Sequence, residues 1–577
     1  MFLPTTKEEL NKLGWKKLDV ILISGDTYID SSYSGAAVIG KVLLDAGYKV
    51  GIIAQPDYKS DKDIKRLGEP ELFWGVTSGC VDSMVANFTA SKKRRRQDDF
   101  TPGGENNRRP DRAVIIYSNL IRQYFKNTKP IVIGGIEASL RRIAHYDYWD
   151  DKIRRSILFD AKADILVYGM GEKAILEIAD RLANEKPCEG SACPPLAETF
   201  ARLHDIRGIS YISKTPKEGY INLPSFNQVS DDKKKFIEMF HIFYRNNDPV
   251  TSKGLCQQYS DRYLIQNPPA NNLTQEEIDK IYNLDYERNV HPFYLKDGKV
   301  RAMDTIQFSI TTHRGCYGEC NFCAISVHQG TAITSRSEQS IIREANEIVH
   351  DPGFKGYIQD VGGPTANMYA TGCDKMQTHG ICLKKDCVFP TTCKNLDNNH
   401  RPQIELLRKL RKIDGVKKVF VASGIRYDMI LDDKESGDEY LHELIEHHVS
   451  GQLKIAPEHT EDKVLGLMRK PGTRYLTEFK KRFDRTNAKL QKNQFLTYYL
   501  IAAHPGCSLE DEVKMKQFVS KELKTNPEQV QIFTPTPSTY STLMYYTEIN
   551  PWTGEKLFVE KNLGEKNKRK KIITNKL

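Results

Sequence analysis

The uneven placement of the cysteines constrains this chain more than any other feature of its sequence. Seven of the twelve cysteines lie between Cys316 and Cys393, in a chain of 577 residues. The first residues lack the pattern of a secretory signal, and no apolar run reaches the roughly 18 residues that a membrane span needs. We therefore predict a cytoplasmic protein without membrane contact, whose clustered cysteines bind a metal or a metal cluster and do not form disulfides.

The N-terminal third has the pattern of a parallel α/β domain. Apolar runs at residues 18–24 and 49–54 flank a helical stretch, and two further apolar runs that end in glycine follow at 130–135 and 164–169. This alternation predicts a Rossmann-like domain over residues 1–205. Neither a dinucleotide-binding glycine motif nor a P-loop motif occurs, so the sequence gives no support for nucleotide binding in this domain.

Composition divides the rest of the chain. Residues 206–297 are polar and weakly periodic, and we expect a connecting region with short helices there. A core domain is expected over 298–560, followed by a lysine-rich, disordered tail over 561–577. The tail accounts for much of the net charge of +10, and the basic run at 92–96 is expected to be a solvated loop. Nucleic acid therefore stays open as a partner but is unsupported.

Three cysteines form the most specific motif of the sequence. Cys316, Cys320 and Cys323 are separated by three and then two residues, so one compact loop can present three thiolates to a single polynuclear centre. Three thiolates on a four-iron cluster leave one iron without a protein ligand, which gives a catalytic centre its open coordination site. A zinc site could use the same cysteines with His313 or His328. The spacing favours the iron–sulfur interpretation.

This motif, with Phe322 just before its last cysteine, resembles the signature of radical S-adenosylmethionine (SAM) enzymes. Later segments resemble the other motifs of such enzymes, in the expected order. They are the Gly-Gly motif in Asp360–Thr365 and the strand-like runs at 419–428, 453–459, 498–506 and 530–535. The whole chain, including its N-terminal domain, resembles the YgiQ-type radical SAM proteins.

The resemblance implies a fold and a cofactor set. The expected fold class is α/β, with an N-terminal Rossmann-like, cobalamin-binding-like domain followed by a radical SAM (β/α) partial TIM barrel. Cys316, Cys320 and Cys323 would ligate a [4Fe-4S] cluster, and SAM would bind its open iron. A one-electron donor such as flavodoxin or ferredoxin is the expected partner, together with a substrate that the sequence does not identify.

The resemblance also implies a reaction type. SAM would yield a 5′-deoxyadenosyl radical that abstracts hydrogen from the substrate. Hydrogen abstraction needs no acid or base, so no catalytic residue is assigned. The residues at the matching motif positions, which we expect to contact SAM, are Gly362, Gly363, Ser423, Arg426 and Glu458.

A second cysteine group lies in an insert at residues 366–400. Cys373, Cys382, Cys387 and Cys393 fall within 21 residues that contain little apolar material. They predict a second metal site, either four-thiolate zinc or an auxiliary iron–sulfur cluster, and their spacing does not decide between the two. The other five cysteines are expected to be buried structural thiols; they are Cys80, Cys188, Cys193, Cys256 and Cys507.

Cobalamin is the remaining cofactor question, since related enzymes carry a cobalamin-binding domain at the N-terminus. The family's DxHxxG motif is missing here, so we predict that cobalamin is unlikely. Two alternative functions remain beside a radical SAM enzyme of unidentified substrate. One is an RNA- or protein-modifying, methylthiotransferase-like enzyme, and the other is a non-catalytic iron–sulfur or zinc protein that binds nucleic acid.

Overall fold

The computed structural model describes residues 1–184 and 201–575. These residues form two compact units. Unit 1 contains residues 1–271 and 284–307, and unit 2 contains residues 272–283 and 308–577. Each unit has its own buried apolar core, as expected of a chain of this length.

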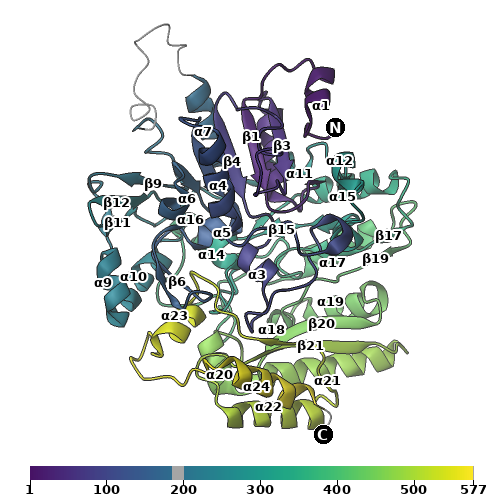
Figure 1. Cartoon of the computed structure of the whole chain (residues 1–577). Helices are drawn as coiled ribbons and strands as arrows, with labels where there is room; N and C mark the ends of the chain where they lie inside the picture. The colour runs from purple at the N-terminus through teal and green to yellow at the C-terminus, as the bar shows by residue number, and fades with distance from the viewer. Residues whose placement is uncertain (185–200, 576–577) are drawn as a thin grey trace. The chain divides into compact units, whose positions relative to one another are not determined.

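Unit 1 is built on one nine-stranded sheet (Figure 1). Five strands at one side pair in parallel in the order β3-β1-β4-β5-β8, and β9, β12, β11 and β10 extend the sheet beyond β8. In chain order these five parallel strands stand 2-1-3-4-5, which is the flavodoxin-like arrangement of a doubly wound sheet. The topological switch point, where such sheets bind ligands, therefore lies between β1 and β4.

The bounds of the sheet strands are β1 Val20–Ser24, β3 Val50–Ala54, β4 Phe73–Thr77, β5 Ile131–Gly134, β8 Ile165–Val167, β9 Ile209–Ser213, β10 Ile221–Asn222, β11 Leu255–Tyr259 and β12 Arg262–Gln266. The short strands are β2 Ile29–Asp30, β6 His145–Asp147, β7 Lys152–Arg154 and β13 Asn289–Val290. The helices are α1 Lys7–Lys12, α2 Gly35–Asp45, α3 Ser83–Asn87, η1 Pro102–Gly104, α4 Ala113–Tyr124, α5 Gly135–Leu140, α6 Ile157–Ala161, α7 Glu172–Ala183, α9 Phe226–Asp231, α10 Lys233–Arg245, α12 Pro292–Leu295 and α13 Met303–Ile306.

The predicted strands of the N-terminal domain are confirmed at β1, β3, β5 and β8. All five residues of β1 and of β3 are buried, because a parallel strand in the middle of an α/β layer is covered on both faces. The sequence analysis missed β4, although Phe73 and Trp74 are fully buried in it. Gly75 interrupts the apolar residues of this strand, so the apolar run is too short to be distinguished from a loop by sequence alone.

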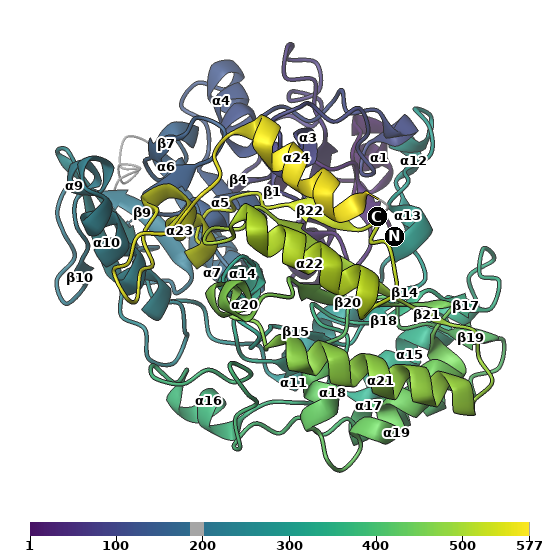
Figure 2. The same ribbon diagram turned by 90° about the horizontal axis from the view of Figure 1, so that it is seen from below.

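Unit 2 is a series of parallel strands that follow one another in chain order. The first, β14, pairs with β18, and the continuous stretch β17–β18 pairs with β19. A single bridge from Ile425 to Ile455 leads on to β20, which pairs with β21 and then β22. Helices cover the outer face of these strands, and Figure 2 shows α21, α22 and α24 lying over β20–β22. This is the strand–helix alternation of a (β/α) barrel domain.

The strands of unit 2 are β14 Ser309–Thr311, β15 His313–Arg314, β16 Thr334–Ser335, β17 Tyr357–Ile358, β18 Asp360–Gly362, β19 Lys418–Val419, β20 Gln452–Glu458, β21 Phe495–Ala502 and β22 Val530–Ile532. The helices are α11 Gln275–Tyr282, α14 Ile325–Gln329, α15 Glu338–Val349, α16 Asp374–His379, α17 Arg401–Leu410, α18 Tyr427–Asp432, α19 Gly437–Glu443, η2 Leu444–His448, α20 Asp462–Met468, α21 Thr473–Lys489, α22 Leu509–Lys521, α23 Tyr540–Thr547 and α24 Leu563–Thr574.

Two of the predicted boundaries are wrong. Residues 206–297 are not a connecting region, because β9–β12 continue the sheet of unit 1 and α11 belongs to unit 2. The disordered tail is also wrong, since α24 occupies most of 561–577 and packs against α22. Ile573 in this helix is fully buried, and Lys566 donates a 2.8 Å hydrogen bond to the Tyr545 hydroxyl. The apolar residues between the lysines were too few to reveal an amphipathic helix.

Candidate functional site

The loop that carries Cys316, Cys320 and Cys323 lies between β15 and α14 and is fixed by hydrogen bonds to backbone carbonyls. The Cys316 N–H donates to the Gly330 carbonyl at 3.1 Å, and the Ser326 hydroxyl donates to the Cys316 carbonyl at 3.0 Å. At the other end of the loop, the Asn321 amide donates to the Leu467 carbonyl at 2.8 Å. These bonds hold the three thiols on one short, ordered turn.

The three thiols share a partly buried position with one guanidinium group. Arg426 Nη1 lies 3.7 Å from Cys320 Sγ, and Arg426 Nη2 forms a 2.6 Å ion pair with Asp428. Burial, and then the neighbouring Cys320 and Cys316, raise the pKa of the Cys323 thiol to about 12. A metal cluster that binds here must therefore displace the thiol protons, as thiolate ligation always requires.

A glycine leaves the space between these groups open. A Cβ atom on Gly318 would stand 3.3 Å from Cys316 Sγ and 2.8 Å from Arg426 Nη1. Three cysteines on one loop fit a [4Fe-4S] cluster by donor type and by number. Within residues 1–184 and 201–575, no group of three or more Cys, His, Asp or Glu side chains is already arranged so that it could hold a metal ion.

Gly362 is the last residue of β18 and Gly363 follows it, and close packing explains both glycines. A Cβ atom on Gly363 would lie 2.6 Å from the imidazole of His313, which is fully buried. A Cβ atom on Gly362 would lie 3.5 Å from Ser423 Cβ, so these two predicted SAM contacts stand side by side. The Ser423 hydroxyl is itself engaged, since it donates to the Asp360 carboxylate.

Glu458 ends β20 in a conformation that its sequence does not reveal. Its φ of 69° is in the left-handed region, which costs a non-glycine residue free energy and is typical of functional sites. Burial raises the pKa of Glu458 to about 7, against the opposing charge of Lys470. The carboxylate also raises the pKa of the Cys323 thiol. Of the five predicted SAM contacts, Arg426 and Glu458 thus lie nearest the cysteine triad, while Gly362 and Ser423 adjoin one another.

The sequence analysis missed an ion-pair link in this loop. Glu319, between the first two cysteines, has a φ of 41° and lies 3.8 Å from Arg469 Nη1. Arg469 Nε also donates to Asp386 at 2.7 Å. Asp386 precedes Cys387, so Arg469 connects the loop of the triad with the insert that carries the second cysteine group. No sequence pattern predicts this link, because the three residues are far apart along the chain.

The remaining cysteines take different environments. Cys256 and Cys507 are buried as predicted, whereas Cys80 is exposed and contradicts the prediction; Cys188 and Cys193 lie outside the described residues. Cys507 Sγ lies 3.4 Å from His459 Nε2 and packs beside Phe322. Phe322 is therefore part of a small apolar cluster.

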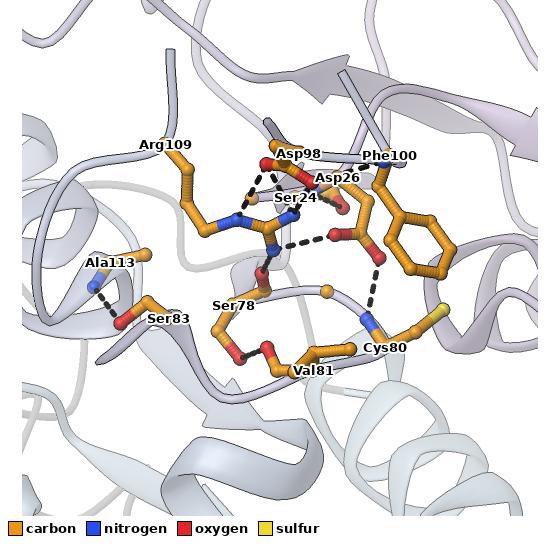
Figure 3. A network of polar contacts seen from close by, with 12 residues as sticks. Ser24, Asp26, Ser78, Cys80, Val81, Ser83, Asp98, Phe100, Arg109 and Ala113 are labelled. Carbon is orange, nitrogen blue, oxygen red and sulfur yellow. Dashed lines mark hydrogen bonds and ion pairs between the residues drawn. The ribbon is translucent and has the colours of Figure 1, made fainter. Parts of the chain in front are cut away.

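The switch point of unit 1 is closed by a network of charged side chains (Figure 3). Arg109 forms ion pairs with Asp26 at 2.6 Å and with Asp98 at 2.9 Å, and all three side chains are at most 3% exposed. The Cys80 N–H donates to the second oxygen of Asp26 at 2.6 Å. The ends of β1 and β4 are thus tied to the segment that follows them.

In the part of the chain that the structure describes, no helix is long and apolar enough to cross a membrane.

Comparison with known proteins matches these two units separately. The model of the Radical SAM N-terminal family matches residues 2–309, and that of the Radical SAM superfamily matches residues 310–519. A fold that combines a doubly wound sheet with a (β/α) domain bearing a cysteine triad thus defines the chain as a radical SAM protein. The chain belongs, within this superfamily, to the UPF0313 family.

Two curated relatives support that assignment over the full length. A UPF0313 protein of Fusobacterium nucleatum is 59% identical over 576 residues, which covers 100% of this chain and 99% of the relative. A UPF0313 protein of Thermotoga maritima is 49% identical over 574 residues, covering 99% and 98%. The prediction of a radical SAM family protein is confirmed by these matches.

A solved structure shares the fold at low identity. The radical SAM methyltransferase TsrM from Kitasatospora setae, with cobalamin and a [4Fe-4S] cluster bound, aligns with a TM-score of 0.50 and 13% identity over 91% of this chain and 74% of its own. The prediction that cobalamin is unlikely is contradicted by this finding and by the match to the Radical SAM N-terminal family.

Proposed function

We propose that the chain is a radical SAM enzyme that modifies a substrate still to be identified. One observation supports the proposal most: three cysteine thiols stand on one turn of the (β/α) unit, beside the guanidinium of Arg426. When bound, a [4Fe-4S] cluster with SAM supplies an electron to the sulfonium, and SAM then yields methionine and a 5′-deoxyadenosyl radical. Cys316, Cys320 and Cys323 would hold the cluster.

The chain's own residues have three tasks in this proposal. Arg426, paired with Asp428, brings a positive charge to the sulfur of Cys320 and so offsets the negative charge of the thiolates. Gly362 and Gly363 let a bound methionine backbone approach β18, because neither has a side chain in the way. Glu458 presents a carboxyl beside Cys323, where it can accept a hydrogen bond from a ribose hydroxyl once it is ionised.

At the switch point of unit 1 the side chains of Asp26, Arg109 and Asp98 are engaged with one another. Cobalamin forms a separate arm of the experiment, because the shared fold makes it a cofactor to test. The methylthiotransferase-like alternative is tested through the products of that same experiment.

The experiment is a SAM-cleavage assay on anaerobically reconstituted full-length protein, with a strong one-electron reductant and with or without hydroxocobalamin. We expect 5′-deoxyadenosine and methionine from the wild type, and neither product from Cys320→Ala, which should also lose the cluster's visible absorbance. Cys80→Ala is the matched control, because Cys80 lies in the other unit and outside both cysteine groups. The proposal would be contradicted if wild-type protein with a fully reconstituted cluster released no 5′-deoxyadenosine, either with or without hydroxocobalamin.

A further inference from the structure

The second cysteine group occupies a loop whose two ends are joined. Gly372 and Asp397 exchange two backbone hydrogen bonds, of 2.9 and 2.8 Å, and so close the segment between them. Two side chains anchor this loop to the rest of unit 2: Asp386 pairs with Arg469, and the Thr392 hydroxyl donates to Asp432 at 2.6 Å. The loop is therefore a defined substructure with a fixed base.

Within this loop three of the four cysteines lie close together. The Cys393 N–H donates to the Cys387 carbonyl at 2.8 Å, so these two residues are adjacent in space. Cys373, Cys387 and Cys393 pack against the same small apolar cluster. Cys382 belongs to the same closed loop and is exposed.

The apolar core of the insert is small. Between Gly372 and Asp397 the buried apolar side chains are those of Met376, Val388 and Leu396. They share one cluster with Tyr317, Ile333, Met368 and Met429, against which Cys373, Cys387 and Cys393 pack. Three side chains bury too little surface to order a loop of this length, given the conformational entropy that each fixed residue costs. Metal binding supplies folding free energy in segments of this kind.

We propose that Cys373, Cys382, Cys387 and Cys393 bind one Zn²⁺ ion as a closed, four-thiolate structural site. Four thiolates complete the tetrahedral coordination of Zn²⁺ and leave no open position, so this site orders the insert and does not bind substrate. The sulfurs do not yet surround a common point, and Cys382 is exposed, so the ion must draw that side chain inward by rotation about its bonds.

The proposed zinc site adjoins the cysteine triad. Tyr317, which is 1% exposed, belongs to the apolar cluster against which both Cys316 and Cys387 pack. Arg469 also contacts Glu319 in the triad loop and Asp386 beside Cys387. Ordering of the insert by Zn²⁺ therefore fixes Asp386, and through Arg469 it stabilises the loop that carries the triad.

Metal analysis of anaerobically purified full-length protein tests the site. We expect about one zinc per chain in the wild type, and less than about a tenth of that in Cys387→Ser and Cys382→Ser. Cys320→Ala should lose its iron yet keep its zinc, and Cys80→Ser should keep both. Because Cys382 is exposed, Cys382→Ser keeps the test valid even where Cys387→Ser fails to fold. Cys320→Ala also separates this inference from the proposed function, since its zinc content does not depend on SAM chemistry.

A second measurement uses Co²⁺ in place of Zn²⁺. Metal-free Cys320→Ala protein titrated with CoCl₂ should develop the visible absorption of tetrahedral Co²⁺–thiolate coordination, and Cys320→Ala/Cys387→Ser should not. An unchanged zinc content in a folded Cys382→Ser protein would contradict the proposed four-thiolate site. A loss of iron and sulfide from that variant, without a loss of zinc, would overturn the assignment of Zn²⁺.

Discussion

Arg426 Nη1 lies 3.7 Å from Cys320 Sγ while its other terminal nitrogen is paired with Asp428 at 2.6 Å. A buried positive charge is thereby held next to a cysteine that we propose as a cluster ligand. Burial opposes this charge, but Asp428 and then Cys320 raise the pKa of Arg426 well above its usual value. The guanidinium thus stays charged where an electron is expected to arrive.

Removal of this charge should make the proposed cluster harder to reduce. In Arg426→Gln we expect the midpoint potential to fall by roughly 60 mV, which corresponds to a tenfold change in a one-electron equilibrium, at unchanged iron content. Arg426→Lys, which keeps the charge, should stay close to the wild type. Redox titration followed by electron paramagnetic resonance measures both, and an unchanged potential in Arg426→Gln would contradict the assigned role.

Gly363→Ala should destabilise unit 2 because the new Cβ would stand 2.6 Å from the His313 ring. Overpacking of this kind costs about 1–3 kcal/mol, and each kcal/mol lowers Tm by about 2–4 °C in a unit of this size. Gly424→Ala is the control, since no atom lies within 4 Å of its added Cβ. Thermal unfolding compares the two variants, and an equal effect of both would rule out the proposed clash.

Arg109→Met should destabilise unit 1, because it leaves Asp26 and Asp98 buried without their counter-charge. The expected loss in the free energy of unfolding is about 3–5 kcal/mol. Replacing both carboxylates as well, in Asp26→Asn/Asp98→Asn/Arg109→Met, should restore more than half of that loss. Denaturant unfolding measures the recovery; a triple variant no more stable than Arg109→Met would refute the ion-pair account.

Glu443 contributes to the stability of unit 2 in a way that depends on pH. Burial alone would raise its pKa, but hydrogen bonds from His448 and Arg408 and the charge of Arg411 lower it to about 2. Because this pKa is lower in the folded than in the unfolded protein, the ionised carboxylate stabilises the fold at pH values above the unfolded pKa of about 4.5. This stabilisation is lost as the pH falls toward 2. Glu443→Gln should therefore cost up to roughly 3 kcal/mol at pH 7, with a difference from wild type that narrows below pH 4.5.

Thermal unfolding at several pH values follows that difference. Glu446→Gln serves as the control because Glu446 lies on the same helical segment and its side chain is 38% exposed. Its difference from wild type should be small at every pH. A gap between Glu443→Gln and wild type that stayed constant from pH 7 to pH 4 would count against the linkage.

The C-terminal helix α24 should contribute to stability through its charged residues. Arg569 donates to the Cys507 carbonyl at 3.1 Å and lies 3.7 Å from Glu512 and 3.6 Å from Glu560. Arg569→Ala therefore removes the donor to this carbonyl and the nearby positive charge of both carboxylates. We expect a loss of about 1–3 kcal/mol. Lys571→Ala, at an exposed position of the same helix, should change the Tm little. Equal behaviour of the two would favour a disordered tail after all.

Part of this fold could be read from local patterns. Fully buried parallel strands such as β1 and β3 are continuous apolar runs, and Gly25 marks the end of β1. Less regular elements escaped prediction for a physical reason. The segment 206–297 alternates weakly because β11 and β12 extend the sheet edge, and α24 buries only a few of its many charged residues.

The sequence by itself determined the family and pointed to the cysteines that we propose as metal ligands, because thiols at fixed spacing on one loop are a local property of the chain. The tertiary structure decided which distant groups meet these thiols. Arg426 reaches Cys320, Glu458 adopts a left-handed conformation beside Cys323, and Arg469 links Glu319 with Asp386. Such contacts join residues up to about a hundred and fifty positions apart, and only the packing of strands and helices around a common core sets the distances between them.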